Sequence, residues 1–179
     1  MLNDIKEVLF SEEQLAGICA RLGKQISEDY KDKNLLLVSV LKGSVVFMAD
    51  LMRNITINCP IDFMSVSSYG SGTVSTGIVK IKKDLDINLE GYDLLLVEDI
   101  LDSGKTLSNL RSMLSLRNPK SIKICTLLDK PDRREADVTA DYVGAIIPDA
   151  FVVGYGLDYD EKYRNLPFIG ILKSSVYES

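Results

Sequence analysis

Two acidic side chains followed by a stretch with hydroxyls, a glycine and a lysine form the part of this sequence best suited to chemistry. Glu98 and Asp99 end an apolar run, and residues 102–106 read Asp-Ser-Gly-Lys-Thr. A glycine lets the backbone turn closely around an anion, while hydroxyls and the free amides of a helix start donate hydrogen bonds to phosphate oxygens. The pattern therefore predicts a phosphomonoester site beside two carboxylates.

The same segment admits two other interpretations. Gly104-Lys105-Thr106 matches the end of a P-loop, but the first glycine of that pattern would fall on Asp99, whose charge would oppose the anion. An NTPase loop is therefore disfavoured. The second interpretation is an ordinary strand-to-helix junction with Asp102 or Ser103 as the N-cap and the acids solvated. A run this long in this order is much rarer than such a cap, which favours the anion site.

The absence of histidine limits the possible mechanisms. None of the 179 residues is histidine, which excludes Ser-His-Asp and Cys-His nucleophilic systems and His-liganded metal sites. A proton-transfer group must therefore be Asp, Glu, Lys, Tyr or Cys. The net charge of −5 and the pI of about 4.8 disfavour a nucleic-acid partner, because phosphate backbones are bound by clustered Lys and Arg.

Cysteine usage and hydropathy indicate the compartment. Cys19, Cys59 and Cys125 are odd in number and far apart, so we expect reduced thiols rather than disulfides or a zinc site. No apolar run approaches the roughly 18 residues of a membrane span, and the N-terminus lacks the order of a signal peptide. We expect a cytoplasmic protein with no membrane partner, folded as one domain over residues 1–179.

The elements that must position these residues follow from hydrophobic periodicity. Ser11 to Gln14 has the form of a capping box, and helical spacing of apolar residues follows it. Further helices are expected at 45–52 and 105–116, and strands at 35–40, 62–67, 78–81, 93–97, 122–128, 142–146, 151–153 and 168–172. This alternation predicts an α/β fold with a mostly parallel sheet flanked by helices, and ligands at its carboxyl edge.

Two polar segments are expected to be surface features. Residues 69–77 hold three glycines and four hydroxyl residues, which is typical of a mobile loop. Residues 132–135 read Asp-Arg-Arg-Glu, and we expect a solvated turn with no special role.

The segment from Val97 to Thr106 resembles the phosphoribosyl-pyrophosphate signature of type I phosphoribosyltransferases. Other segments are similar to the hypoxanthine-guanine branch of that family, in the same order along nearly the whole chain: Leu41-Lys42-Gly43, Ser68-Tyr69, Leu127 to Lys130, and Phe151 to Tyr159 followed by Arg164. The resemblance implies the type I fold, with a small hood subdomain made from the chain ends and a flexible active-site loop at about 68–77.

The resemblance also implies an activity in purine salvage. It is the Mg²⁺-dependent transfer of 5-phosphoribosyl from phosphoribosyl pyrophosphate to N9 of hypoxanthine or guanine, giving IMP or GMP and pyrophosphate. Such a pentosyltransferase works mainly by electrostatic positioning, because its transition state carries positive charge on the sugar and negative charge on pyrophosphate. Members of the family are usually homodimers or homotetramers, so we expect an assembly.

By the same resemblance, Glu98 and Asp99 face the ribose hydroxyls directly or through Mg²⁺, and Asp158 is a second Mg²⁺ contact. Asp102 is the catalytic candidate, which handles the purine N7 proton as N9 attacks the sugar. Backbone amides of the turn at 41–43 hold pyrophosphate, often with a non-proline cis bond. The phosphoribosyl-pyrophosphate and nucleotide contacts comprise Leu41, Lys42, Gly43, Ser68, Tyr69, Glu98, Asp99, Asp102, Ser103, Gly104, Lys105, Thr106 and Arg164.

The resemblance implies that a separate set of residues binds the purine base. Lys130 donates to the purine 6-oxo group, which distinguishes hypoxanthine and guanine from adenine. Phe151 stacks on the base, and backbone carbonyls near Val152 and Asp158 read its 2-position. Asp129, next to Lys130, has no role in this interpretation.

Several related activities are alternatives to this one. Orotate and adenine relatives share the phosphate signature but lack the context of Lys130 and residues 151–158, and a xanthine preference is the nearest enzymatic alternative. A regulatory protein that senses phosphoribosyl pyrophosphate and binds nucleic acid is the non-enzymatic one. The acidic pI and the presence of both Asp102 and Lys130 count against that protein.

Overall fold

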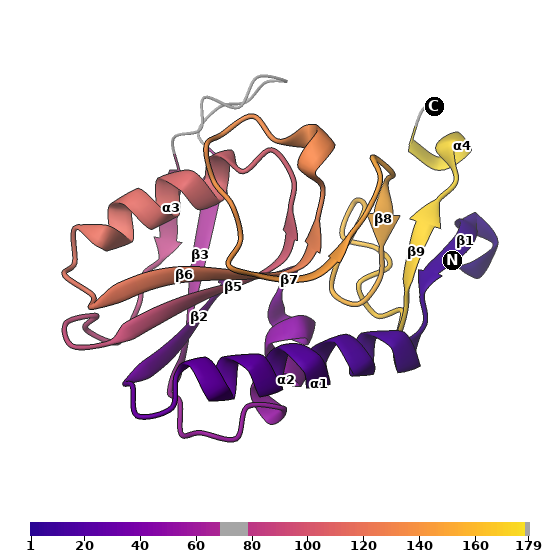
Figure 1. Cartoon of the computed structure of the whole chain (residues 1–179). Coiled ribbons are helices and arrows are strands. Elements are labelled where there is room, and N and C mark those ends of the chain that lie inside the picture. Colours follow the sequence, from indigo (N-terminus) through magenta and orange to yellow (C-terminus); the bar gives the residue numbers. More distant parts are fainter. Residues whose placement is uncertain (69–78, 178–179) are drawn as a thin grey trace.

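The computed structural model describes residues 1–68 and 79–177, so Tyr69, the rest of the predicted loop and the first residue of the strand expected at 78–81 lie outside it. Figure 1 shows a large sheet with helices on both of its faces and a small sheet beside it. The helices and strands are η1 (Leu2–Asp4), β1 (Ile5–Phe10), α1 (Glu12–Asp29), β2 (Leu35–Leu41), α2 (Val45–Arg53), β3 (Ile61–Ser68), β4 (Val79–Lys83), β5 (Asp93–Leu101), α3 (Lys105–Ser115), β6 (Ser121–Asp129), η2 (Pro131–Arg133), β7 (Tyr142–Ile146), β8 (Val152–Val153), β9 (Ile169–Leu172) and α4 (Ser174–Tyr177).

The large sheet has the strand order β4-β3-β2-β5-β6-β7. Its neighbours are parallel except for β3 and β4, which run antiparallel. The chain passes from β2 to β3 on one side and returns to β5 on the other, so the strand order reverses between β2 and β5. Open parallel sheets bind ligands at the carboxyl ends of strands at such a reversal. The predicted mostly parallel α/β sheet is confirmed.

Alternating residues of the central strands face two different helix layers. Leu35 and Leu37 of β2 pack in the core with α1 and α2, whereas Leu36 and Val38 pack in the core with α3. Figure 1 shows the same arrangement, with α1 and α2 below the sheet and α3 above it. A strand buried on both faces reads as a continuous apolar run, which explains the sequence of β2.

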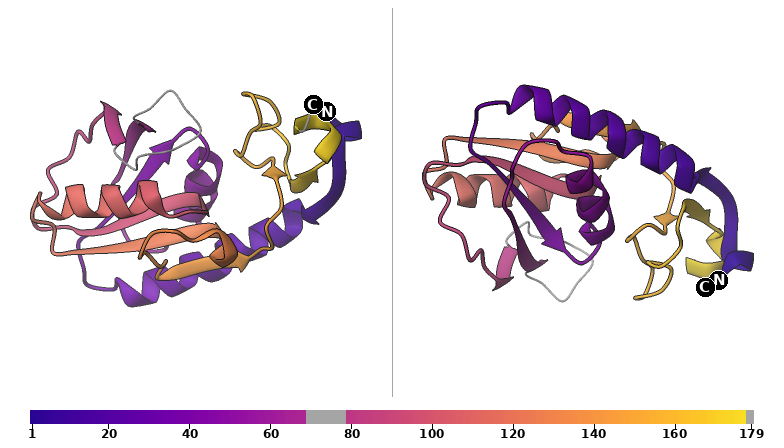
Figure 2. Two further views of the ribbon diagram at one scale, coloured as in Figure 1. Left: turned by 90° about the horizontal axis from the view of Figure 1, so that it is seen from above. Right: turned by 90° about the horizontal axis from the view of Figure 1, so that it is seen from below.

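The first helix forms as its sequence predicts. The Ser11 hydroxyl accepts a hydrogen bond from the Gln14 amide, and the Gln14 side chain accepts one from the Ser11 amide, which completes the capping box. Leu15, Cys19 and Ile26 then lie on the buried face of the helix. Because α1 runs from the small sheet along the large one, it holds the two sheets together (Figure 2).

The chain ends form the three-stranded antiparallel sheet β1-β9-β8, as expected for a hood. The Lys173 amide donates to the Asp4 carbonyl at 2.9 Å, which ties the C-terminal segment to the N-terminal one. Strand β1 was not predicted, because Ile5 to Phe10 do not alternate between apolar and polar residues. Its pairing with β9 has two irregularities of register, which explains the missing period.

The state of the cysteines agrees with the expectation from the sequence. All three thiols are free; Cys19 and Cys125 are buried, and Cys59 is partly buried. Within residues 1–68 and 79–177, no helix combines the length and the apolar character that a membrane crossing requires.

Candidate active site

A cavity of about 270 Å³ lies at the carboxyl ends of β2 and β5. It is bounded by the turn after β2, including Leu41 and Gly43, and by the segment that begins at Glu98. Six of the predicted phosphoribosyl residues from that segment and the helix start line it: Glu98, Asp99, Asp102, Ser103, Gly104 and Thr106. The structure thus brings together two motifs that are far apart in the sequence.

The turn after β2 and the acidic pair lie in direct contact. A Cβ atom on Gly43 would lie 1.9 Å from Asp99 Oδ2, so only glycine allows the carboxylate to approach this backbone. The Leu41–Lys42 peptide bond is cis, as the family resemblance suggested. The Ser44 hydroxyl accepts a hydrogen bond from Ser39 at 2.6 Å, which anchors the far end of the turn to β2.

Helix α3 begins with a glycine in the left-handed region rather than with a side-chain cap. Gly104 is the N-cap with φ of 79°, so the alternative of Asp102 or Ser103 as N-cap is wrong. A Cβ at this position would meet Val138 Cγ1 at 2.5 Å, which adds a steric reason for glycine. Gly104 has no side chain to cap the helix, and the Lys105 amide makes only a long contact with Ser103 Oγ, at 3.5 Å. The first amides of α3 lie beside the cavity, where an anion can accept from them.

The two carboxyl groups at the end of β5 are held in an environment that disfavours charge. Burial raises the pKa of Glu98 well above its usual range, and the adjacent Asp99 charge adds to the effect. Burial also raises the pKa of Asp99 to about 6, against weaker opposing hydrogen bonds from the backbone. Desolvated carboxylates of this kind are stabilised in their charged form when a cation or hydroxyl donors reach them.

These carboxyl groups fit a divalent cation that is shared with a substrate. Among the described residues there is no group of three or more His, Cys, Asp or Glu side chains that would enclose a metal. Mg²⁺ is commonly held by only one or two carboxylates, with waters and substrate phosphates as the other ligands. The oxygen donors of Glu98 and Asp99 suit that mode, whereas Asp158 lies on a different loop and is paired with Arg164 at 3.0 Å.

A second cavity, of about 410 Å³, adjoins the first. Both cavities are bounded by Ile100 and Asp102, so these two residues lie at their junction. All four predicted base-binding residues line the second cavity: Lys130, Phe151, Val152 and Asp158. A ligand that fills both cavities would therefore pass Asp102, whose side chain is 43% exposed.

The lysine and the aromatic ring of the second cavity each have partners in this structure. The Lys130 side chain is only 9% exposed, and its Nζ lies 3.3 Å from Asp149 Oδ1. The Phe151 ring stacks on the Tyr177 ring with centroids 4.9 Å apart, and it lies perpendicular to the Tyr159 ring with centroids 5.5 Å apart. Phe151 remains 37% exposed, and it lines the cavity together with Tyr177.

The expectation that residues 132–135 form a solvated turn with no special role is wrong for Arg134. Its side chain is 17% exposed. It donates to the carbonyl oxygens of Asp102, Leu101 and Val138 at 2.9, 3.1 and 2.7 Å, and it pairs with the Asp129 carboxylate. Arg134 therefore fixes the main chain of Asp102, and Asp129 acquires a role as its counterion.

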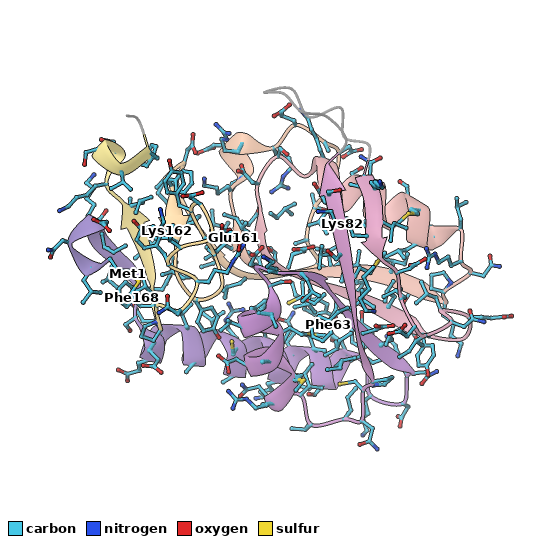
Figure 3. The ribbon with its side chains drawn as sticks, turned by 180° about the vertical axis from the view of Figure 1, so that it is seen from behind. Met1, Phe63, Lys82, Glu161, Lys162 and Phe168 are labelled. Carbon is cyan, nitrogen blue, oxygen red and sulfur yellow. The ribbon has the colours of Figure 1, made fainter. Side chains whose placement is uncertain are left out.

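A chain of ion pairs joins the turn after β2 to the loop between β8 and β9. Lys42 Nζ lies 3.0 Å from Glu161 Oε2, and Arg164 contacts both Glu161 and Asp158. Figure 3 labels Glu161 on the side of this loop that faces the large sheet. The Arg164 Nε is shielded from solvent and has no hydrogen-bond partner among the described residues. Lys42 and Arg164, the predicted pyrophosphate contacts, thus share one acidic neighbour.

Lys105, another predicted phosphate contact, lines neither of these cavities. The Lys105 side chain points to Glu135, with Nζ and Oε2 2.5 Å apart, so only its backbone lies at the start of α3. Ser68 is the last residue of β3, and Tyr69 lies outside the described residues.

Sequence reasoning missed several residues of this site. Ile100 lies within the recognised motif, yet its place at the junction follows only from the geometry of the strand end. Arg133, Asp149 and Tyr177 line the second cavity from three different segments. Charged residues in short turns are usually solvated, so no pattern in the sequence singled out Arg133, Arg134 or Asp149.

Comparison with known proteins agrees with this geometry. Residues 7–160 match the family model described as phosphoribosyl transferase domain. The hypoxanthine-guanine phosphoribosyltransferase of Bacillus subtilis is 56% identical over 179 residues, covering 100% of this chain and 99% of that protein. Its counterpart in Staphylococcus epidermidis is 56% identical over 177 residues, covering 99% of each chain.

Solved structures show the same similarity. A crystal structure of a hypoxanthine phosphoribosyltransferase from Staphylococcus aureus has a TM-score of 0.98 at 55% identity, covering 100% of this chain and 97% of that one. A hypoxanthine-guanine phosphoribosyltransferase from Bacillus anthracis, with a HEPES molecule in its active site, has a TM-score of 0.91 at 52% identity, covering 94% and 99%. The chain therefore belongs to the phosphoribosyltransferase family and has the fold of its type I members.

Proposed function

We propose that this chain catalyses purine salvage by transferring 5-phosphoribosyl from phosphoribosyl pyrophosphate to N9 of hypoxanthine or guanine. The products are IMP or GMP and pyrophosphate. The observation that carries the proposal is that two cavities meet at Asp102. The start of helix α3, which suits a phosphate group, lines the first cavity, and the nearly buried Lys130 lines the second. The names of the bacterial relatives support the same base assignment.

The first cavity holds the phosphoribosyl group. The open amides at the start of α3 and the hydroxyls of Ser103 and Thr106 bind the 5-phosphate, while Glu98 and Asp99 bind the ribose hydroxyls. Amides of the turn at 41–43, with Lys42 and Arg164 nearby, bind the pyrophosphate. When bound, Mg²⁺ would neutralise the negative charge that develops on the leaving pyrophosphate. Glu98 and Asp99 would hold it together with waters and substrate oxygens, and Asp158, from its own loop, would be a further contact on the pyrophosphate side.

The second cavity orients the base. The Lys130 ammonium donates to the 6-oxo oxygen of hypoxanthine or guanine. The 6-amino group of adenine is itself a hydrogen-bond donor, so it cannot accept from the lysine. Phe151 stacks on the ring, and main-chain carbonyls near Val152 and Asp158 accept from a 2-amino group. This orientation directs N9 toward the sugar and N7 toward Asp102.

Asp102 is the group that handles the proton. One of its oxygens, Oδ1, is shielded from solvent without a hydrogen-bond partner among the described residues, although the Arg133 Nε lies at ion-pair distance, 3.5 Å. Arg134 fixes the main chain behind it. The carboxylate can therefore accept the N7 proton as N9 attacks, in a protein without histidine, and positioned proton transfer of this kind contributes about 10²–10⁴-fold.

We also propose that the protein acts in the cytoplasm as a homodimer or homotetramer, with small molecules as its only substrates. The usual state of its family supports this. Light scattering of the purified protein measures the assembly.

The proposal is tested by turnover on four bases. Purified protein is incubated with saturating phosphoribosyl pyrophosphate, Mg²⁺ and hypoxanthine, guanine, xanthine or adenine, and nucleotide and pyrophosphate are quantified. We expect turnover with hypoxanthine and guanine and little with adenine or xanthine. Activity with adenine alone would refute the base assignment, and ligand binding without pyrophosphate release would identify a sensor instead of an enzyme.

A further inference from the structure

The lysine proposed to read the base has one acidic partner. Lys130 is nearly buried, and among the described residues Asp149 is the only carboxylate in ion-pair contact with it, at 3.3 Å. A buried ammonium without a partner pays a large desolvation penalty. Asp149 is itself 53% exposed, so it supplies the counterion from the cavity wall without being buried.

The two residues are delivered by loops that are tied to each other and to the sheet. The Lys130 amide donates to the Leu101 carbonyl at 3.0 Å, and the Ile147 amide donates to the Asp129 carbonyl at 2.9 Å. Asp149 lies between Ile147 and Phe151, the ring that lines the same cavity. The distance between the ammonium and its counterion is therefore set by backbone contacts rather than by two free side chains.

Arg133 is a second cation in contact with Asp149. The turn η2 places its side chain on the same cavity as Lys130, because the Arg133 amide donates to the Lys130 carbonyl at 3.1 Å. Its Nη1 lies 3.7 Å from Asp149 Oδ2, and its Nε lies 3.5 Å from Asp102 Oδ1. Asp149 is thus held between two cations, with one oxygen toward each of them.

We propose that Asp149 is a positioning residue that presents the Lys130 ammonium to the 6-oxo group of the base. The lysine has three N–H donors, so it can keep the contact with Asp149 while a second donor reaches the base. Arg133 holds the other carboxylate oxygen and prevents Asp149 from following the lysine. This role rests on the proposed recognition of the 6-oxo group by Lys130, and it goes beyond that recognition by naming the residue that aims the donor.

A double-mutant cycle tests the proposal. Asp149→Asn keeps the size and the polar character of the side chain but removes the charge. We expect it to raise the KM for hypoxanthine about tenfold, the equivalent of one well-placed ionic contact. The KM for phosphoribosyl pyrophosphate should change less than about twofold. In a Lys130→Ala background, Asp149→Asn should have no further effect on the KM for hypoxanthine.

Two other variants keep the test specific. Asp149→Glu retains the carboxylate and should recover most of the lost affinity. Asp132→Asn changes an exposed acid in the adjacent turn that has no ion pair within the described part of the chain, and its KM values should equal those of the wild type. Thermal melting of each variant verifies that it is folded.

The outcomes separate this inference from the proposed function. If Asp149→Asn leaves the KM for hypoxanthine unchanged, lowers it, or raises it equally in both backgrounds, Asp149 does not act through Lys130 and the inference is overturned. If Lys130→Ala alone leaves the KM for hypoxanthine unchanged, the proposed base recognition fails, irrespective of Asp149.

Discussion

Arg134 donates through Nε to the main-chain oxygen of Asp102 at 2.9 Å, and the same guanidinium reaches two other carbonyls. The guanidinium contacts Asp102 through its backbone, which leaves the side chain of this candidate catalytic residue available to a ligand. Asp129 balances the charge of the arginine. The main chain of Asp102 is thus held by a residue outside both cavities.

Replacing Arg134 by lysine should therefore affect catalysis as well as stability. Lysine keeps the positive charge that pairs with Asp129, but its single ammonium cannot donate to the carbonyls of Asp102, Leu101 and Val138 at once, as the guanidinium does. We expect a loss of about 1–3 kcal/mol in the free energy of unfolding. We also expect a fall of about tenfold or more in kcat at a temperature where the variant is fully folded.

Arg117→Lys is the matched control for that variant. Arg117 also forms a forked ion pair, with Asp84 at 2.8 and 3.0 Å, but it lines neither cavity. It should leave kcat unchanged. A kcat of wild-type size in folded Arg134→Lys would show that Arg134 has a structural role only.

Asp102→Asn should lower turnover far more than it lowers substrate affinity. The amide has a similar shape but cannot accept the N7 proton, so kcat should fall about 100-fold or more. The KM for phosphoribosyl pyrophosphate should change by less than about threefold, because the phosphate contacts remain. Steady-state kinetics with Asp137→Asn, an exposed acid, as the control checks this, and an unchanged kcat would reject the role of Asp102.

Lys130→Ala should weaken the binding of the base and of the nucleotide product. A hydrogen bond from a charged donor is worth about 1.5–3 kcal/mol, so the KM for hypoxanthine and the Kd for IMP should rise about 10- to 100-fold. Calorimetric titration with IMP measures the second quantity. Lys120→Ala, at an exposed position remote from both cavities, serves as the control, and equal affinities for wild type and Lys130→Ala would refute the assignment.

Asp99→Asn should stabilise the protein while it lowers activity. The native carboxyl, with a pKa of about 6, holds its proton to higher pH than the unfolded one, near 3.8. Between these values the native state binds more protons, so the free energy of unfolding falls as pH rises, by up to about 3 kcal/mol. Because asparagine does not titrate, the free energy of unfolding of the variant does not fall in this way, and the variant should be more stable than the wild type at pH 7.5.

Chemical denaturation at pH 3.5 and pH 7.5 tests the sign. At pH 3.5 the Asp99 carboxyl is largely protonated in both states, so the stabilities of the wild type and Asp99→Asn should be similar. If the variant is less stable than the wild type at pH 7.5, the charged Asp99 carboxylate does not destabilise the native state. That result would contradict the view that the protein keeps this carboxylate for ligand binding at the expense of stability.

Much of this site could be predicted because its residues lie in one segment. The run from Glu98 to Thr106 occupies one strand end and one helix start, so all of its members except Lys105 line a single cavity by local geometry alone. The continuous apolar run of β2 and the capping box of α1 likewise specified the central elements.

Contacts between distant segments could not be predicted in the same way. The contact of Gly43 with Asp99 depends on β2 and β5 being neighbours, which only the strand order reveals. Arg134 lies in a charged turn whose composition is typical of solvated loops, and its burial follows from how that turn folds over the end of β5. Strand β1 was missed because its edge pairing is irregular.

The most direct test of the central claim is a crystal structure with IMP and Mg²⁺ bound. The account predicts the base in the second cavity, with Lys130 Nζ about 3 Å from the 6-oxo oxygen and the Asp102 carboxylate facing N7. The 5-phosphate should lie at the start of α3. A nucleotide whose base lies outside the second cavity, or whose 6-oxo oxygen points away from Lys130, would contradict it.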